Sequence, residues 1–403
     1  MKNLFKTILA QAVHGALFFL AGCAGSVWMA SCSSDSPIAD AGQDELKFDA
    51  SVAGNWTSNS LTRATATTLA TLEKFYVTAI GNGTNFFTDL EVRKTTDGDS
   101  DATWAYIGEY YWPGYTLRFF AYAPTTLTGA SISNSSQTIS YTPASAGAEQ
   151  QDFVVAYNSY NVTEGSVALN FKHALSQIEV QALNASPTTM QVEVVGVKLS
   201  NAVSASTFRY AAPGDASSYA LSTATNWPAS SATATADYEI SPTSGNTDGE
   251  VITLTSDAQP LMFGNATNTD NWMLIPQTST AWAGGTTDTG VYLSVLCRIT
   301  DLTHDLLLWP DTEVLKEEAI TTIGSGSDAK TYAYSAVPLA ITWEPGRKYT
   351  YTLNFFTEGN GGGQVEPGSG SIGNDGDTVV CPITVTATVT EWADGGEVGA
   401  ELL

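Results

Sequence analysis

The sequence predicts an all-β protein built as a β-sandwich. Short runs in which apolar and polar residues alternate recur through most of the 403-residue chain, and this is the period of strands with one buried face. Clusters of Gly, Asn, Asp and Pro separate the runs, as they do between the strands of a sandwich. No long stretch has the 3.6-residue spacing of an amphipathic helix.

The N-terminal residues have the features of an export signal. Two lysines precede an apolar run, Ile8–Gly22, which is typical of a signal peptide. Two cysteines follow small residues, as at a bacterial lipoprotein cleavage site. Cys32 is favoured because a Ser/Asp-rich tether follows it, and Cys23 is the alternative because the residues before it fit the usual motif better. We expect residues 1–31 to be a lipoprotein signal peptide and the acylated cysteine to anchor the chain to a membrane.

The stretch from residue 45 to residue 64 is predicted to hold a first strand and a protease site. Its apolar residues alternate with polar ones, and they are Leu46, Phe48, Ala50 and Val52. Burying the larger of these side chains would contribute roughly 5–8 kcal/mol as an upper bound. A polar run then leads to Arg63, where a trypsin-like protease would cut the Arg63–Ala64 bond of an exposed loop.

Loss of that strand would leave an apolar groove with unpaired strand edges, which a strand from another chain could fill. The alternative is that the stretch is simply the first strand of a β-domain.

Nine further runs are predicted to be strands. Several have one apolar face and one face of Thr, Ser or charged residues, which indicates a sheet with one side in water. The runs are Lys74–Ile80, Tyr115–Tyr122, Asp152–Tyr157, Val167–Phe171, Gln177–Leu183, Gln191–Leu199, Val291–Ile299, Lys348–Phe355 and Ile383–Val389.

Two polar stretches resemble ligand-binding loops only in part. Asp97–Asp101 has the alternate aspartates of a calcium loop, but Ala102 and Gly108 stand where such a loop needs glycine and glutamate. Gly359–Asp377 contains a GxGxxG pattern without the strand before it and the helix after it that a dinucleotide site requires. We expect a solvated turn and a flexible connection between two strands, respectively.

Composition excludes several classes of function. The formal charge is −25, from 41 acidic and 16 basic residues, so a nucleic-acid partner, which needs clustered Lys and Arg, is not expected. Only three histidines occur, and one lies in the leader. His173 stands between two strand runs and is expected to be structural. We therefore predict no catalytic residues, no metal site and no cofactor.

The remaining cysteines and several tryptophans leave alternatives open. Cys297 and Cys381 each share the phase of apolar neighbours in a predicted strand. A disulfide between them is possible in an exported protein, and two buried thiols are the alternative. Five tryptophans could line a sugar-binding face, although packing in cores and at corners is favoured: Trp104, Trp112, Trp272, Trp343 and Trp392.

Six segments, taken in order along the chain, carry a resemblance to a known family. They are Tyr110–Pro124 (YYWPGYTLRFFAYAP), Gln151–Ala156 (QDFVVA), Phe171–Ile178 (FKHALSQI), Met273–Gln277 (MLIPQ), Trp343–Tyr351 (WEPGRKYTY) and Ile383–Trp392 (ITVTATVTEW). Together they resemble the fimbrillin family, the type V pilins and related fimbrial lipoproteins of Bacteroidales.

The resemblance implies two tandem transthyretin-like β-sandwich domains after the signal peptide. The N-terminal domain would span residues 64–168 and the C-terminal domain residues 169–403. Residues 32–63 would form the tether and a propeptide strand. Export as a lipoprotein and display on the outer membrane are also implied.

The resemblance further implies a non-enzymatic structural subunit of a cell-surface pilus. A trypsin-like assembly protease would cut after Arg63, and sister pilin subunits would then join by β-strand exchange. The residues after Trp392 are few and glycine-rich, so the chain could be a stalk subunit or a tip or accessory subunit. The alternative function is a monomeric surface lipoprotein that binds glycans.

Overall fold

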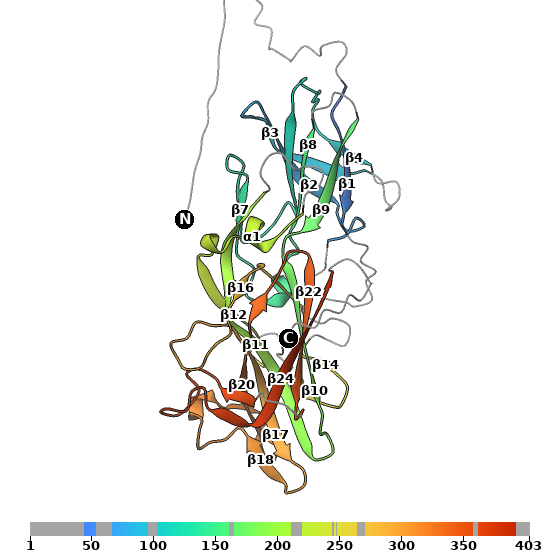
Figure 1. Cartoon of the computed structure of the whole chain (residues 1–403). Helices are drawn as coiled ribbons and strands as arrows, with labels where there is room; N and C mark the ends of the chain where they lie inside the picture. Colours follow the sequence, from blue (N-terminus) through green and yellow to red (C-terminus); the bar gives the residue numbers. More distant parts are fainter. Residues whose placement is uncertain are drawn as a thin grey trace, which may run out of the picture. The chain divides into compact units, whose positions relative to one another are not determined.

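The described part of the chain folds mainly into β-sheets (Figure 1). The computed structural model describes residues 44–53, 67–95, 103–160, 165–210, 220–243, 246, 248–263, 271–357 and 362–391. All of these residues belong to one unit, residues 43–403. The predicted all-β class is confirmed. None of the helices in the described part of the chain has the length and apolarity that a membrane crossing requires.

The first sheet has seven strands in the order β1-β9-β8-β5-β2-β3-β4. Its strands are β1 (Lys47–Val52), β2 (Lys74–Gly81), β3 (Thr84–Lys94), β4 (Trp104–Tyr106), β5 (Leu117–Ala123), β8 (Val154–Tyr160) and β9 (Ser166–His173). All neighbours are antiparallel except β1 and β9, which run parallel.

The second sheet has fifteen strands along a branched path. The main path runs β14 (Gln259–Pro260), β10 (Ser176–Asn184), β22 (Arg347–Phe355), β24 (Thr378–Glu391), β23 (Gly362–Val365), β20 (Lys330–Pro338), β17 (Tyr292–Asp301), β11 (Met190–Arg209), β7 (Thr138–Tyr141) and β6 (Ala130–Ser133). The side strands are β12 (Ala234–Ile240), β13 (Ile252–Thr253), β15 (Trp272–Leu274), β18 (Leu306–Trp309) and β19 (Thr321–Ile323). In this sheet β10 and β22 run parallel.

The remaining elements are short. A third sheet pairs β16 (Thr278–Ser279) with β21 (Ile341–Thr342). The helices among the described residues are α1 (Thr223–Asn226) and the 3-10 turns η1 (Gly147–Glu149), η3 (Ala229–Ser231), η4 (Glu317–Ala319) and η5 (Gly326–Asp328).

All nine predicted runs lie in strands of the structure, with ends displaced by a few residues except at the end of β11. The domain limits at residues 168 and 169 stay a prediction. In the structure β9 continues to His173, and β10 of the second sheet begins at Ser176. The residues between them therefore carry the chain from one sheet to the other.

Strand β11 is twice as long as its pattern predicts, because a bulge lets it change partners. Asn201 has a φ of +65°, in the left-handed region that asparagine tolerates better than most residues. The pairing register with β12 shifts at this point. Before the bulge β11 pairs with β17, and after it with β7. Small buried residues such as Ala202 and Ser206 continue the strand.

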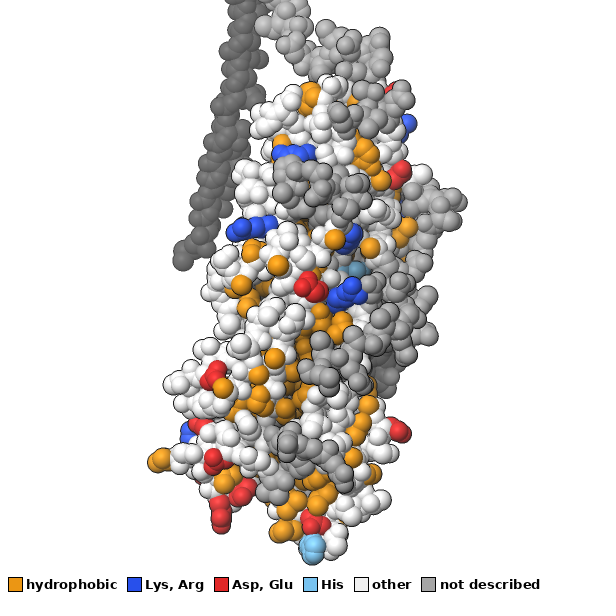
Figure 2. Space-filling view, in the orientation of Figure 1, with side chains coloured by type: hydrophobic (Ala, Val, Ile, Leu, Met, Phe, Trp, Pro, Cys, Tyr) orange, Lys and Arg blue, Asp and Glu red, His pale blue; other side chains and the backbone are white. Residues whose placement is uncertain are grey.

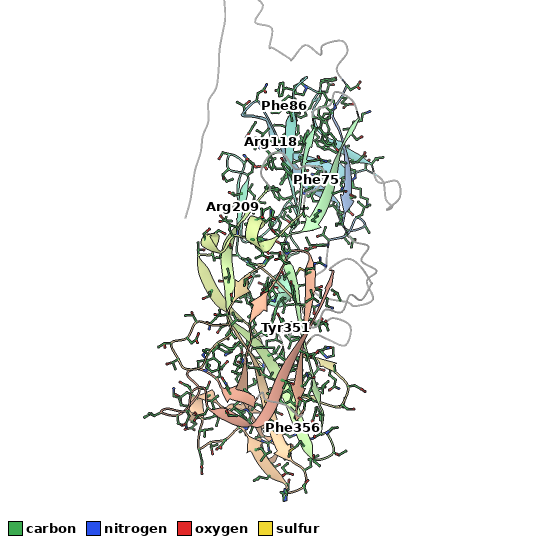
Figure 3. The ribbon with its side chains drawn as sticks, viewed as in Figure 1. Phe75, Phe86, Arg118, Arg209, Tyr351 and Phe356 are labelled. Carbon is green, nitrogen blue, oxygen red and sulfur yellow. The ribbon has the colours of Figure 1, made fainter. Side chains whose placement is uncertain are left out.

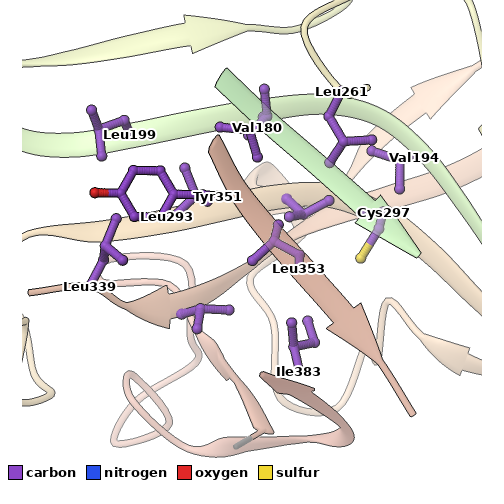
Figure 4. Packing of buried hydrophobic residues seen from close by; sticks show 14 of the residues in the cluster. Val180, Val194, Leu199, Leu261, Leu293, Cys297, Leu339, Tyr351, Leu353 and Ile383 are labelled. Atoms are coloured by element: carbon purple, nitrogen blue, oxygen red, sulfur yellow. The ribbon is translucent and has the colours of Figure 1, made fainter. Parts of the chain in front are cut away.

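The main core lies between two parts of the second sheet, as in a sandwich. Side chains from β10 and β22, such as Val180 and Leu353, pack with those from β11 and β17, such as Leu199 and Leu293 (Figure 4). Cys297 belongs to this core and is fully buried, as its strand phase predicts. The other face of β17 is buried too, which the alternation alone did not indicate.

The first sheet encloses a core rich in aromatic rings. Phe75 from β2 (Figure 3), Phe119 from β5 and Phe171 from β9 are fully buried in it. A third cluster joins this sheet to the second one, because Val155 of β8 and Phe208 of β11 pack together there with their neighbours.

The glycine-rich connection before β24 is more ordered than its composition predicts. Within it Gly362–Val365 form β23, and Glu366 is buried. The Glu366 carboxylate lies 2.7 Å from Lys198 Nζ and accepts a hydrogen bond of 2.8 Å from Ser294 Oγ. The expectation of a flexible connection is therefore wrong for this part, because one buried ion pair fastens the loop to β11. The predicted turn Asp97–Asp101 lies outside the described residues.

Candidate functional site

The candidate site consists of β1, at the edge of the first sheet, and the residues that β1 contacts. Along β1 the burial alternates without a break. Leu46 and Phe48 are 0% and 3% exposed, and Ala50 and Val52 are partly buried. The side chains between them, such as Asp49, face solvent. The predicted strand and its predicted phase are confirmed.

One edge of β1 pairs with β9. The pairing is parallel and runs from Lys47 opposite Ser166 to Val52 opposite Phe171. It places Phe48 beside Val167 and Ala50 beside Leu169, both of which are fully buried. Outside the ladder, the side chain of Ser51 hydrogen-bonds that of Asn170.

The start of β1 is also held by the segment that follows β4. The backbone N–H of Leu46 donates to the carbonyl of Tyr110 at 2.8 Å, and the N–H of Trp112 donates to the carbonyl of Asp44 at 3.1 Å. The hydroxyl of Tyr106 donates to the carbonyl of Leu46. In the strand order of the first sheet, β1 lies at one end, beside β9, and β4 lies at the other end. The hydrogen bonds from Tyr106 and the segment after β4 therefore link the two ends of the sheet.

Phe48 is the central contact of β1 with the core. Its ring meets four other aromatic rings edge to face, with centroids 5.8–6.4 Å apart, a favourable geometry for aromatic pairs. The four rings are those of Phe75, Phe87, Tyr106 and Phe119. We call the surface formed by these rings and the edge of β9 the β1 slot. Without β1 it would be an apolar groove beside an unpaired strand edge.

The chain leaves β1 and returns to the fold at the same end of β9. The N–H of Ala53 donates to the carbonyl of Phe171 at 2.7 Å. On the return, the N–H of Thr67 donates to Asp152 Oδ2 at 2.5 Å. That carboxylate lies 2.9 Å from Nδ1 of His173, the last residue of β9. The intervening residues, with Arg63 and Ala64, lie outside the described part of the chain.

The other predicted positions are distributed as follows. Cys297 lies in β17, and Cys381 lies in β24 in a part whose side chain is not described, so the disulfide stays a prediction. Cys23 and Cys32 lie outside the described residues. Trp112, Trp272 and Trp343 are at most 1% exposed and Trp104 packs partly buried against the aromatic core, so core packing is confirmed for these four.

His173 is a buried partner of Asp152, as its expected structural role requires. No group of three or more His, Cys, Asp or Glu side chains among the described residues is arranged to hold a metal ion. On the face that Figure 2 shows, lysine and arginine side chains lie apart from one another and form no continuous basic patch.

Comparison with known proteins identifies the family. A family model described as Fimbrillin-like matches residues 62–295, which is more than half of the chain. The chain belongs to the fimbrillin-like family. Its members are structural proteins rather than enzymes, so this fimbrillin-like chain is a fimbrial protein of the cell surface. No curated protein matches it.

Two solved structures match the chain, the first of them with a similar fold. A fimbrial protein from Bacteroides vulgatus is 15% identical, with a TM-score of 0.50, and the match covers 87% of this chain and 100% of that one. The tip fimbrial protein Mfa3 from Porphyromonas gingivalis, solved with a C-terminal truncation, is 11% identical with a TM-score of 0.38. That match covers 86% of this chain and 99% of that one.

Replacing Tyr106 with phenylalanine tests how the fimbrillin-like fold holds β1. The variant lacks the hydroxyl that bonds Leu46, so the uncleaved chain should lose about 1 kcal/mol in its free energy of unfolding. Burial first, and then the charge of Glu45, raise the pKa of Tyr106 to about 12.

Because the folded pKa lies above the unfolded value of about 10, the stabilisation by this hydroxyl is present below pH 10. It is lost as the pH rises towards 12. The difference between the wild type and Tyr106→Phe should therefore shrink over that range in urea titrations. A difference that stays constant from pH 8 to pH 12 would contradict this assignment.

Proposed function

We propose that this chain is a stalk, tip or accessory subunit of a cell-surface pilus that assembles by β-strand exchange. It is exported with residues 1–31 as a lipoprotein signal peptide and is anchored to the outer membrane through Cys32, with Cys23 as the alternative. Residues 32–63 are the tether and propeptide strand, and the mature body consists of two tandem transthyretin-like sandwiches, residues 64–168 and 169–403.

The observation that carries the proposal is the way β1 is held. Its contacts are an edge pairing with β9, hydrogen bonds at its start and apolar side chains inserted into the β1 slot. Its chain connection to β2 passes through residues 54–66, and the described residues on either side, Ala53 and Thr67, are both held at the same end of β9. A trypsin-like protease that cuts after Arg63 would leave β1 bound by non-covalent contacts alone.

Strand exchange follows from that arrangement. Before the cut, the covalent connection keeps β1 at a high effective concentration beside the slot. After the cut, neither β1 nor a strand from a sister subunit is covalently linked to the body, so the two compete for the β1 slot by affinity alone. Either can bind, because the slot recognises only backbone pairing and alternate apolar side chains. At the other end of the chain, β24 is built into the second sheet between β22 and β23, so the described part of β24 belongs to the subunit's own fold.

Limited trypsin treatment of the folded, lipid-free protein tests the proposal. We expect one early cut, after Arg63, identified by mass spectrometry of the new N-terminus at Ala64. Oligomer ladders should then be visible on gels run without boiling. Arg63→Ala should abolish both results, because trypsin requires the basic side chain.

Arg93→Ala is the matched control, because Arg93 lies within β3 and its loss should leave the digestion unchanged. Ladders formed by the Arg63→Ala variant, or early cuts within the sheets, would refute the proposal. A monomeric glycan-binding lipoprotein would remain one species after the cut.

A further inference from the structure

A pocket of about 310 Å³ lies away from the β1 slot. Its walls come from four separate stretches: the later part of β11, the segment with α1 and η3, the segment from Ile275 to Thr278, and Glu344 before β22. Its apolar wall residues include Val203, Trp227, Ile275 and the prolines Pro228 and Pro276. Because one liquid water occupies about 30 Å³, the pocket has room for a ligand of roughly ten non-hydrogen atoms.

Most polar groups in the pocket wall are already paired with each other or with the backbone. Gln277 accepts from the N–H of Val203 at 2.7 Å and donates to the carbonyls of Val203 and Ile275. Ser206 Oγ lies 2.8 Å from Ser231 Oγ, and the hydroxyl of Thr223 donates to a backbone carbonyl. These hydrogen bonds are made within the protein and hold the wall in place. The wall therefore presents mainly apolar surface to a ligand.

Glu344 is the one charged residue of the lining. Its Oε2 accepts a hydrogen bond of 2.7 Å from the N–H of Thr223. Its backbone is fixed on both sides, since its N–H donates to the hydroxyl of Tyr349 and its carbonyl accepts from Ser176. The carboxylate is therefore held in position at the pocket, and the described lining contains no lysine or arginine to neutralise it.

We propose that this pocket binds an organic cation carried on a short apolar body. The apolar walls take the body of the ligand, and the carboxylate of Glu344 takes its ammonium or guanidinium group. Charge complementarity disfavours an anionic ligand, because a second negative charge would meet Glu344 in a described lining that contains no lysine or arginine. A sugar fits poorly, since the wall offers few hydrogen-bonding groups that are still unused.

The same chemistry could come from a free amine or from a lysine side chain in a protein segment. Two probes separate these sources: 2-phenylethylamine, and a capped alanine-rich peptide with one lysine. Tighter binding of the amine identifies a small molecule as the ligand, and tighter binding of the peptide identifies a protein segment. Either result supports the proposal, and failure of both probes to bind at millimolar concentration would overturn it.

Ligand-observed NMR on the full chain provides the measurement. For the better probe we expect a Kd on the order of 0.1–1 mM. The uncharged analogue 2-phenylethanol should bind about tenfold more weakly than 2-phenylethylamine, because it lacks the charge that Glu344 recognises. Higher salt should weaken binding of the amine and leave the alcohol unchanged.

Three variants complete the test. Glu344→Gln keeps an oxygen that accepts from Thr223, so the fold is retained, while amine affinity should fall about tenfold. Ala229→Trp should fill the pocket from its exposed rim and abolish binding of both probes. Glu318→Gln removes an exposed charge elsewhere and should change nothing. Equal binding of the amine and the alcohol, or an unchanged affinity in Glu344→Gln, would overturn the proposal. Neither outcome depends on cleavage at Arg63.

Discussion

Replacing Phe48 with alanine should destabilise the uncleaved chain by about 3–5 kcal/mol and leave the cleaved chain unchanged. The loss is large because the ring is 3% exposed and packs edge to face on four other rings, and truncation of a buried phenylalanine leaves a cavity. It should disappear after cleavage and release of the fragment, because Phe48 precedes Arg63. Urea unfolding before and after trypsin treatment measures both values.

The released fragment gives a second measurement of the same effect. After cleavage, the β1 fragment with alanine at residue 48 should dissociate about 100-fold faster or more, since each 1.4 kcal/mol corresponds to a factor of ten. Asp49→Ala is the matched control, because Asp49 lies on the solvent face of the same strand and should change stability by less than about 0.5 kcal/mol. An equal loss in the cleaved and uncleaved Phe48→Ala proteins would show that β1 is a permanent strand.

The alternation of residues predicted β1 and its buried face, but it could not predict the partner of β1. Parallel pairing with β9 joins Lys47 to Ser166, far apart in the sequence, and nothing local in either strand specifies the other. The edge-to-face rings around Phe48 likewise come from β2, β3, β4 and β5. A local pattern gives the phase of a strand, whereas its position in the sheet depends on distant residues.

The alternation of residues does not predict two long strands, β3 and β20, and each has an identifiable reason. In β3, Asp89 has a φ of +47° and charged residues follow it, so the strand has a kink and only intermittent burial. In β20, Tyr332 and Ala333 are both buried although they are neighbours in the chain. Burial on both faces removes the alternation that predicts a strand.

The pocket at Glu344 had no sequence signal for a related reason. Its walls combine residues from Val203 to Glu344 that share no motif or spacing. Glu344 itself belongs to the Trp-Glu-Pro-Gly turn that carries the family resemblance. That turn explains the backbone at residue 344, but the apolar wall facing its carboxylate is formed only when β11, α1 and η3 come together.

Replacing Asp152 with alanine should destabilise the uncleaved and the cleaved chains equally, by about 3 kcal/mol. Asp152 is 3% exposed and accepts from the N–H of Thr67 at 2.5 Å, and its carboxylate lies 2.9 Å from His173 Nδ1. The variant would remove the acceptor that both nitrogens share, and loss of a hydrogen bond to a buried carboxylate costs about 1.5–3 kcal/mol. The loss survives cleavage because Thr67, Asp152 and His173 all follow Arg63.

Asp152→Asn serves as the control. Its amide oxygen still accepts one of the two hydrogen bonds, so this variant should lose about half as much free energy of unfolding as Asp152→Ala. Unfolding in urea before and after trypsin treatment again provides the measurement. Together with Phe48→Ala, this variant separates two roles at the same end of β9. Under the proposed function, Phe48 stabilises the strand that would leave, and Asp152 would fasten the new N-terminal segment to the body that remains. A loss confined to the uncleaved Asp152→Ala protein would mean that Thr67 loses its contact with Asp152 once β1 has left, and the folded body of the mature subunit would then begin further along the chain.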